Sequence, residues 1–122
     1  MKKFVDDFID FGPGRPYFPS NIHLEYYKPL KKQVDILRED MFQVSYGDDT
    51  LNYAIDVGWY GKSFSTIGFF QVYLIKNANW EESVLRIRCK SIKRLVPALR
   101  KCLERLKKDT DDFRLLPPIV LS

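Results

Sequence analysis

The fold is decided by residues 51 to 75, which read LNYAIDVGWYGKSFSTIGFFQVYLI. Two apolar runs, each with a bulky residue at every second position, stand on either side of a polar bend that contains glycine. A period of two is typical of strands, and a short polar bend between two such runs is typical of an antiparallel pair. We therefore expect this stretch to form two paired strands against which the rest of the chain packs.

The neighbouring sequence extends this pair into a sheet. Residues 41 to 46, MFQVSY, alternate in the same way and are followed by the turn-forming residues GDDT. Residues 84 to 90, VLRIRCK, alternate apolar with basic side chains. Because sequential strands with short turns usually pair in order, the sequence predicts an α+β domain with a four-stranded antiparallel meander over residues 41 to 90.

A long helix over about residues 91 to 107 is predicted to cover one face of this sheet. Ser91 can cap its start, and apolar residues recur along one stripe. Pro97 removes one backbone donor, so either the first turn kinks or the regular helix starts near Pro97. The shared core is predicted to contain Tyr53, Ile55, Val57, Phe70, Val72, Leu74, Leu85, Ile87, Leu95, Leu99 and Leu103.

The two ends of the chain are predicted to add short segments. Helical spacing in residues 3 to 11 predicts a short amphipathic helix, and the prolines and glycines of residues 12 to 20 predict a loop. Weak alternation over residues 22 to 27 suggests an edge strand, and residues 29 to 39 suggest a helix or else an extended segment. The tail, residues 109 to 122, either packs back on the domain or docks on a partner.

Length and composition indicate one globular domain, residues 1 to 122. The chain is 45% hydrophobic and 15% aromatic, which argues against disorder, and its length supports a core without a metal or disulfide. It has neither a run of ~18 apolar residues nor a signal peptide pattern, so we expect a cytoplasmic protein without a membrane segment. Cys89 and Cys102 lack CxxC spacing and are expected to be buried, reduced thiols.

The net charge of +4 is unevenly distributed. Residues 84 to 108 contain ten Lys or Arg and one acid, Glu104, whereas the rest of the chain is mildly acidic. Such asymmetry can mark nucleic-acid binding, although a charged helix face is more often only solvated. The alternative function is therefore a basic nucleic-acid-binding module on the strand and helix of this segment, although no RNA- or DNA-reading motif accompanies the charge.

Catalytic chemistry finds no support in the residue pattern. A hydrolase, nuclease or transferase needs a nucleophile beside a base, paired carboxylates or several metal ligands. Asp48 and Asp49 are expected to be turn formers, Asp56 a solvated strand residue, and His23 a structural or surface residue. We expect no enzymatic activity, no cofactor and no metal site.

Residues 54 to 103, AIDVGWYGKSFSTIGFFQVYLIKNANWEESVLRIRCKSIKRLVPALRKCL, carry a family resemblance that extends over about residues 41 to 106. They resemble small bacterial immunity proteins of polymorphic toxin and contact-dependent growth inhibition systems. The resemblance implies a protein that neutralises a cognate toxin, such as a nuclease, by binding its C-terminal domain. Gly61-Lys62-Ser63 departs from the acidic or proline-bearing residues that follow WY in those proteins. The motif residues are Asp56, Gly58, Trp59, Tyr60, Trp80 and Glu81.

Two surfaces are candidates for binding such a toxin. Trp80 is expected either to fold over the core or to face a partner, and aromatic side chains contribute more at an interface centre than flexible lysines do. The acidic and aromatic loop ends would also complement the basic active site of a nuclease. The favoured surface, the loop set, contains Asp48, Asp49, Tyr60, Trp80, Glu81 and Glu82. The alternative surface, the helix row, contains Arg94, Arg100, Lys101 and Arg105.

Overall fold

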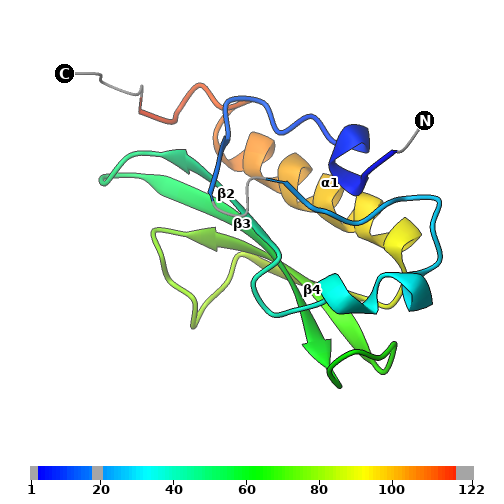
Figure 1. The fold of residues 1–122 in the computed structure, drawn as a ribbon. Coiled ribbons are helices and arrows are strands. Elements are labelled where there is room, and N and C mark those ends of the chain that lie inside the picture. Colours follow the sequence, from blue (N-terminus) through cyan, green and yellow to red (C-terminus); the bar gives the residue numbers. More distant parts are fainter. Residues whose placement is uncertain (1–2, 18–20, 118–122) are drawn as a thin grey trace.

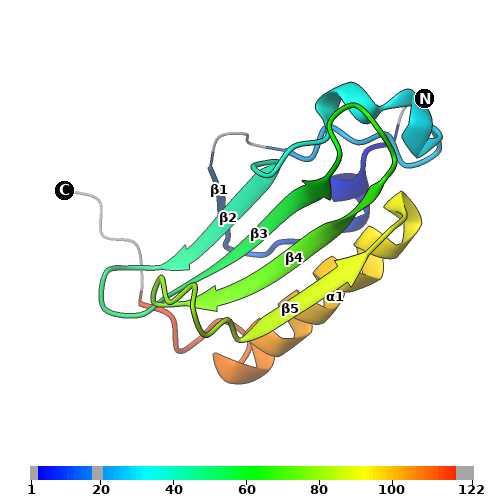
Figure 2. The ribbon, with the colours of Figure 1, turned by 90° about the horizontal axis from the view of Figure 1, so that it is seen from below.

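The computed structural model describes residues 3–17 and 21–117, and the predicted α+β architecture is confirmed. An antiparallel sheet in the order β1-β2-β3-β4-β5 lies on one long helix, α1 (Figures 1 and 2). Each strand pairs with the next one along the chain, as expected for a meander. The elements are β1 Arg15–Pro16, β2 Phe42–Gly47, β3 Asn52–Gly61, β4 Gly68–Lys76, β5 Leu85–Cys89 and α1 Ile92–Asp109.

The core lies between the sheet and α1 and contains the predicted residues. In β3, Tyr53, Ile55, Val57 and Trp59 are buried on the helix side, as the alternation requires. All predicted core side chains are buried except two in the edge strand β5. These two, Leu85 and Ile87, are half-buried and pack against the core.

The fifth strand, β1, was not predicted. It lies within residues 12 to 20, for which the sequence predicts a loop, so that prediction is wrong at Arg15 and Pro16. Arg15 pairs with Ser45, and Pro16 pairs with Val44 at the edge of the sheet. Proline is tolerated there because an edge strand does not need every backbone donor.

The predicted N-terminal elements are shorter than expected. Residues 3 to 11 contain only the 3₁₀ turn η1, Val5–Phe8, and the helix predicted over residues 29 to 39 is replaced by two such turns, η2 Leu30–Lys32 and η3 Val34–Ile36. The predicted edge strand over residues 22 to 27 is reduced to a single bridge between Phe4 and Glu25. Short helices are marginal unless tertiary packing supports them. Here the packing comes from single buried anchors, Val5, Ile22 and Leu24.

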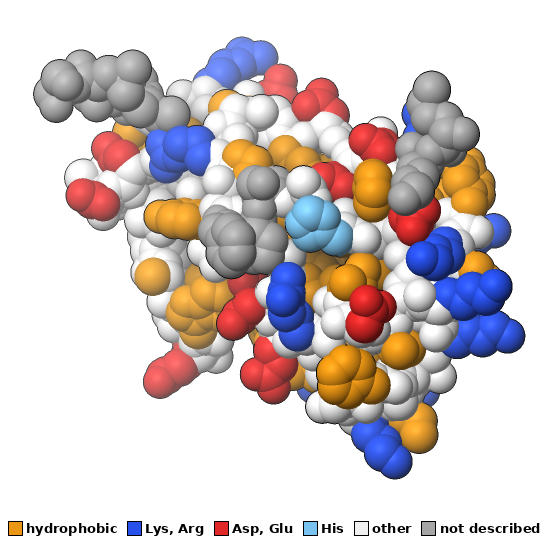
Figure 3. Space-filling view, viewed as in Figure 1, with side chains coloured by type: hydrophobic (Ala, Val, Ile, Leu, Met, Phe, Trp, Pro, Cys, Tyr) orange, Lys and Arg blue, Asp and Glu red, His pale blue; other side chains and the backbone are white. Residues whose placement is uncertain are grey.

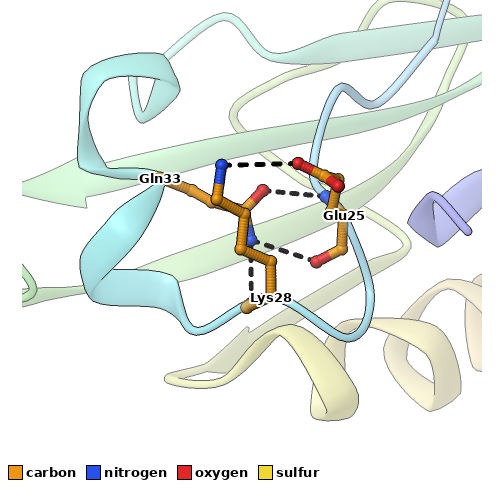
Figure 4. Close-up of polar contacts among 3 residues, drawn as sticks. All are labelled: Glu25, Lys28 and Gln33. Carbon is orange, nitrogen blue, oxygen red and sulfur yellow. Dashed lines mark hydrogen bonds and ion pairs between the residues drawn. The ribbon is translucent and has the colours of Figure 1, made fainter. Parts of the chain in front are cut away.

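Gln33 holds these N-terminal turns together (Figure 4). Its side-chain carbonyl accepts the Glu25 amide at 2.8 Å, and its side-chain amide donates to the Glu25 carbonyl at 3.0 Å and to the Lys28 carbonyl at 2.9 Å. Gln33 is only 3% exposed, so water cannot easily replace these bonds. One glutamine therefore supplies the backbone pairing that a regular strand or helix would otherwise provide.

Replacing Gln33 by alanine is expected to lower the free energy of unfolding by about 2 kcal/mol, because buried backbone groups would lose their partners. Chemical denaturation of both proteins measures this difference. The matched control is Gln43→Ala on β2, since no side-chain hydrogen bond of Gln43 is found among the described residues. Equal losses in the two variants would show that the Gln33 bonds contribute nothing specific.

The helix α1 begins at Ile92, before Pro97, so the regular helix does not start at Pro97. The Ser91 hydroxyl accepts the Arg94 amide at 3.2 Å and caps the helix as predicted. Pro97 lies inside the helix on its exposed side. The buried stripe consists of Ile92, Leu95, Val96, Ala98, Leu99, Cys102, Leu103 and Leu106.

The tail packs back on the domain as far as it is described. Phe113 stacks on Tyr46 with ring centroids 5.7 Å apart, and Leu116 packs against the core. Residues 118–122 of the predicted tail lie outside the described residues. Both cysteines are free thiols, with Cys102 buried and Cys89 half-buried. In the described part of the chain, no helix is long and apolar enough to cross a membrane.

Candidate functional site

The sheet has one covered and one uncovered face. The helix α1 lies against one face, and none of the described helices or strands packs on the other, which we call the open face (Figure 2). Alternation along the strands determines which side chains project there. From β2 to β5 they are Gln43, Ser45, Ala54, Asp56, Gly58, Tyr60, Phe69, Gln71, Tyr73, Ile75, Arg86 and Arg88.

Aromatic side chains run along the open face. Tyr60 stacks on Phe69 across the β3–β4 pair, with centroids 6.2 Å apart. Tyr73 meets the edge of Trp80, from the β4–β5 loop, at 5.9 Å. Trp80 remains 48% exposed, so it contacts an open-face residue rather than covering the core. We call Tyr60, Phe69, Tyr73 and Trp80 the aromatic row.

A chain of hydrogen bonds lies beside the aromatic row. The Arg88 Nε donates to the Gln71 Oε1 at 2.8 Å, and the Gln71 Nε2 donates to the Tyr73 hydroxyl. Because arginine can only donate, it determines which end of the Gln71 amide faces it. The Tyr73 hydroxyl oxygen therefore accepts, which leaves its own proton free to donate elsewhere. Arg88 also lies 4.6 Å from the centre of the Phe69 ring.

Asp56 differs most from its prediction. It was expected to be solvated, but it is only 8% exposed, flanked by Gln43 on β2 and Tyr73 on β4. No hydrogen bond or ion pair to its carboxylate is found among the described residues. Burial, together with the negative charge of Asp40, raises the pKa of Asp56 to about 6.

A bulge brings further acidic residues toward Asp56. The Trp59 amide donates to the Arg38 carbonyl at 2.8 Å, and the Met41 amide donates to the Val57 carbonyl at 3.1 Å. Because Phe42 pairs with Val57, three residues, Glu39, Asp40 and Met41, lie opposite the single residue Gly58, which is an enlarged β-bulge. The Glu39 carbonyl occupies the space where a side chain at Gly58 would begin. Gly58 is therefore needed for this close approach of two backbones.

The loop set is only partly brought together. Asp48, Asp49 and Trp80 line one cavity of about 230 Å³ where the β2–β3 turn meets the β4–β5 loop. Glu81 and Glu82 are exposed in the same β4–β5 loop, whereas Tyr60 lies toward the opposite end of the sheet, on β3.

Asp48 also has the turn-forming role predicted for it. Its carboxylate accepts the amide of Thr50 at 2.8 Å and the Thr50 hydroxyl at 2.7 Å. These bonds lower the pKa of Asp48, the Thr50 hydroxyl most strongly.

The helix row lies on the side of the molecule away from the open face. Two of its members are engaged within the chain: Arg100 donates to the Phe8 carbonyl at 2.9 Å, and Arg105 pairs with Asp109 at 2.9 Å. Arg94 and Lys101 are exposed. Because Arg86 and Arg88 project from the open face, the basic residues of 84 to 108 are divided between two sides of the molecule.

The geometry does not assemble His23 with the acidic residues considered in the sequence. His23 is exposed, as the pale blue side chain in Figure 3 shows, and among the described residues it makes no hydrogen bond to Asp48 or Asp56. Within residues 3–17 and 21–117, no group of three or more His, Cys, Asp or Glu could hold a metal ion. Comparisons with protein-family models, curated proteins and solved structures find no match to this chain.

Proposed function

We propose that this chain is a cytoplasmic immunity protein that binds a cognate toxin domain and neutralises it by occlusion. The observation that carries the proposal is the aromatic row on a sheet face that no described element covers. Tyrosine and tryptophan are enriched at interface centres because they contribute large, rigid contact areas. The resemblance of residues 41 to 106 to immunity proteins supports the same function.

The open face is large enough for such an interface. A standard protein interface buries about 800 Å² on each partner. The described chain exposes 7839 Å² in total, so an interface of that size would cover about a tenth of its surface. The outward face of a sheet with strands of up to ten residues is a surface of this scale.

The charges around the open face favour a basic protein partner over nucleic acid. Asp56 lies on this face, the charge of Asp40 acts on it, and Glu39 and Asp40 both act on the neighbouring Tyr60. The loop set adds further acids at one end of the sheet. Carboxylates repel phosphates but complement a protein surface that itself binds nucleic acid, as a nuclease toxin would present. The nucleic-acid alternative would rely on Arg86 and Arg88, which share the open face with these carboxylates, and on the helix row, which lies on the other side of the molecule.

The test is to mix the purified chain with the C-terminal domain of a toxin encoded directly upstream of its gene. We expect the two proteins to co-elute, the toxin to lose activity, and the complex to persist at high salt, where phosphate contacts would be weakened steeply. The opposite result is an active toxin with no complex, together with RNA or DNA that binds the chain at low salt and dissociates as salt rises.

Paired variants locate the toxin-binding surface. We expect Trp80→Ala combined with Glu81→Ala to weaken toxin affinity by at least about tenfold, because an aromatic anchor is lost. Arg100→Glu combined with Lys101→Glu, on the far side of the molecule, should change affinity by less than about threefold. Each variant is checked for folding by circular dichroism. Wild-type toxin affinity in the variant with Trp80→Ala and Glu81→Ala would show that the β4–β5 loop is not part of the toxin-binding site.

A further inference from the structure

The Asp56 carboxylate lacks a partner within the described chain. A buried ion without a counter-charge or hydrogen bonds is costly, and proteins usually pair such groups. The nearest cation of the same cross-strand row is Arg86 on β5, two strands and about 10 Å away from Asp56. The other open-face arginines are engaged elsewhere: Arg88 contacts Gln71 and Phe69, and Arg15 on β1 donates to the Gly47 carbonyl. The described chain therefore provides no counter-charge for Asp56, and we expect another molecule to provide it.

The surroundings of Asp56 suit an organic cation. The Tyr60 ring leans over Gly58, 3.2 Å from the position that a β-carbon there would occupy, and therefore toward Asp56 along β3. Tyr73 stands on the other side as the cross-strand neighbour of Asp56. Rings next to a carboxylate bind a cation through their negative faces as well as through charge. Glu39 and Asp40 add negative charge from the bulge, and they contribute to the raised pKa of Tyr60 after burial, Asp56 and Tyr73.

We propose that Asp56 binds the guanidinium group of an arginine on the partner protein, with the rings of Tyr60 and Tyr73 beside it. This inference rests on the proposed function, because it assumes a protein partner. Arginine fits better than lysine, since its planar group can stack on aromatic rings while it donates two parallel hydrogen bonds to a carboxylate. The free proton of the Tyr73 hydroxyl offers an additional hydrogen bond to a carbonyl of the partner.

The first test compares two variants with the same chemical change. Asp56→Asn keeps the size of the side chain and removes its charge, and we expect it to weaken toxin affinity by at least about tenfold. The control is Asp111→Asn in the exposed turn after α1, where φ is 50° and asparagine is tolerated. This control should bind like the wild type. Wild-type affinity in Asp56→Asn would overturn the proposal while leaving toxin binding itself established.

The second test does not depend on the toxin. N-acetyl-arginine amide is titrated into the chain and followed by NMR, with the uncharged isostere N-acetyl-citrulline amide as the control ligand. We expect the arginine compound alone to shift the ring resonances of Tyr60 and Tyr73, and Asp56→Asn to abolish those shifts. No shift, or equal shifts with both ligands, would refute the arginine site. Arginine-specific shifts in a chain that binds no toxin domain would instead refute the proposed function and retain the site.

Discussion

Replacing Leu99 by alanine is expected to lower the free energy of unfolding by about 2–5 kcal/mol. Leu99 is fully buried in the middle of the α1 stripe, and α1 contacts β3, β4 and β5. The truncation removes apolar surface that folding takes out of water and leaves a cavity that the rigid sheet cannot fill. Urea denaturation followed by circular dichroism measures the change.

The control for this variant is Leu115→Ala, the same truncation at a side chain that is 62% exposed. It should cost less than about 0.5 kcal/mol, because surface substitutions away from special features rarely cost more. A loss well under 1 kcal/mol at Leu99 would contradict the packing of α1 on the sheet.

The sheet and α1 could be predicted from the sequence because local periodicity reports them directly. Side chains alternate with a period of two in β3 and β4, and α1 has an apolar stripe. These local patterns predict which side of each element is buried without any knowledge of long-range contacts. The Ser91 cap and the Asp48 turn are equally local, since each acts within three residues of its own position. The structure therefore contains these predicted features, and only their end residues differ slightly from the prediction.

The N-terminal turns could not be predicted because their stability comes from distant contacts. Residues 29 to 39 have a partly helical pattern, but Gln33 instead bonds to the backbone of Glu25 and Lys28. A glutamine in a charged stretch carries no signal that it will be buried. The edge strand β1 is similar, because its two residues become a strand only through their pairing with β2.

The candidate site was partly visible in the sequence. Tyr60 and Trp80 were named from their aromatic character, and both lie in the aromatic row. Asp56 lies in a strand as predicted, but the expectation that it is solvated is wrong, because alternation cannot tell how far large neighbours cover a carboxylate. The hydrogen bond between Gln71 and Arg88 was not predicted, because it depends on the register between β4 and β5. Gly58 was the available signal, since glycine inside a strand often marks a bulge or a close backbone approach.

The pH dependence of stability is expected to show the cost of the unpartnered Asp56. Its pKa rises from 3.8 to about 6 on folding, so between these values the folded chain binds more protons than the unfolded chain. The contribution of Asp56 is therefore most favourable below about pH 4, falls as pH rises, and is constant above about pH 6. At about 1.4 kcal/mol for each pKa unit, the shift corresponds to about 3 kcal/mol.

Asp56→Asn should consequently be more stable than the wild type at pH 8, by up to about 3 kcal/mol, and the advantage should shrink toward pH 4. Denaturant midpoints of both proteins across this range give the difference directly. Both proteins share the other charged or titrating groups near Asp56, namely Glu39, Asp40, Tyr60, Tyr73 and the β5 arginines. Both also share Asp48, whose lowered pKa gives the opposite pH dependence. The contributions of these groups therefore largely cancel in the difference. A difference that does not change with pH would show that folding leaves the pKa of Asp56 unchanged. An advantage of the wild type that grows as pH rises would show that Asp56 has a counter-charge in the free protein. In that case Asp56 would not need an arginine of the partner as its counter-charge.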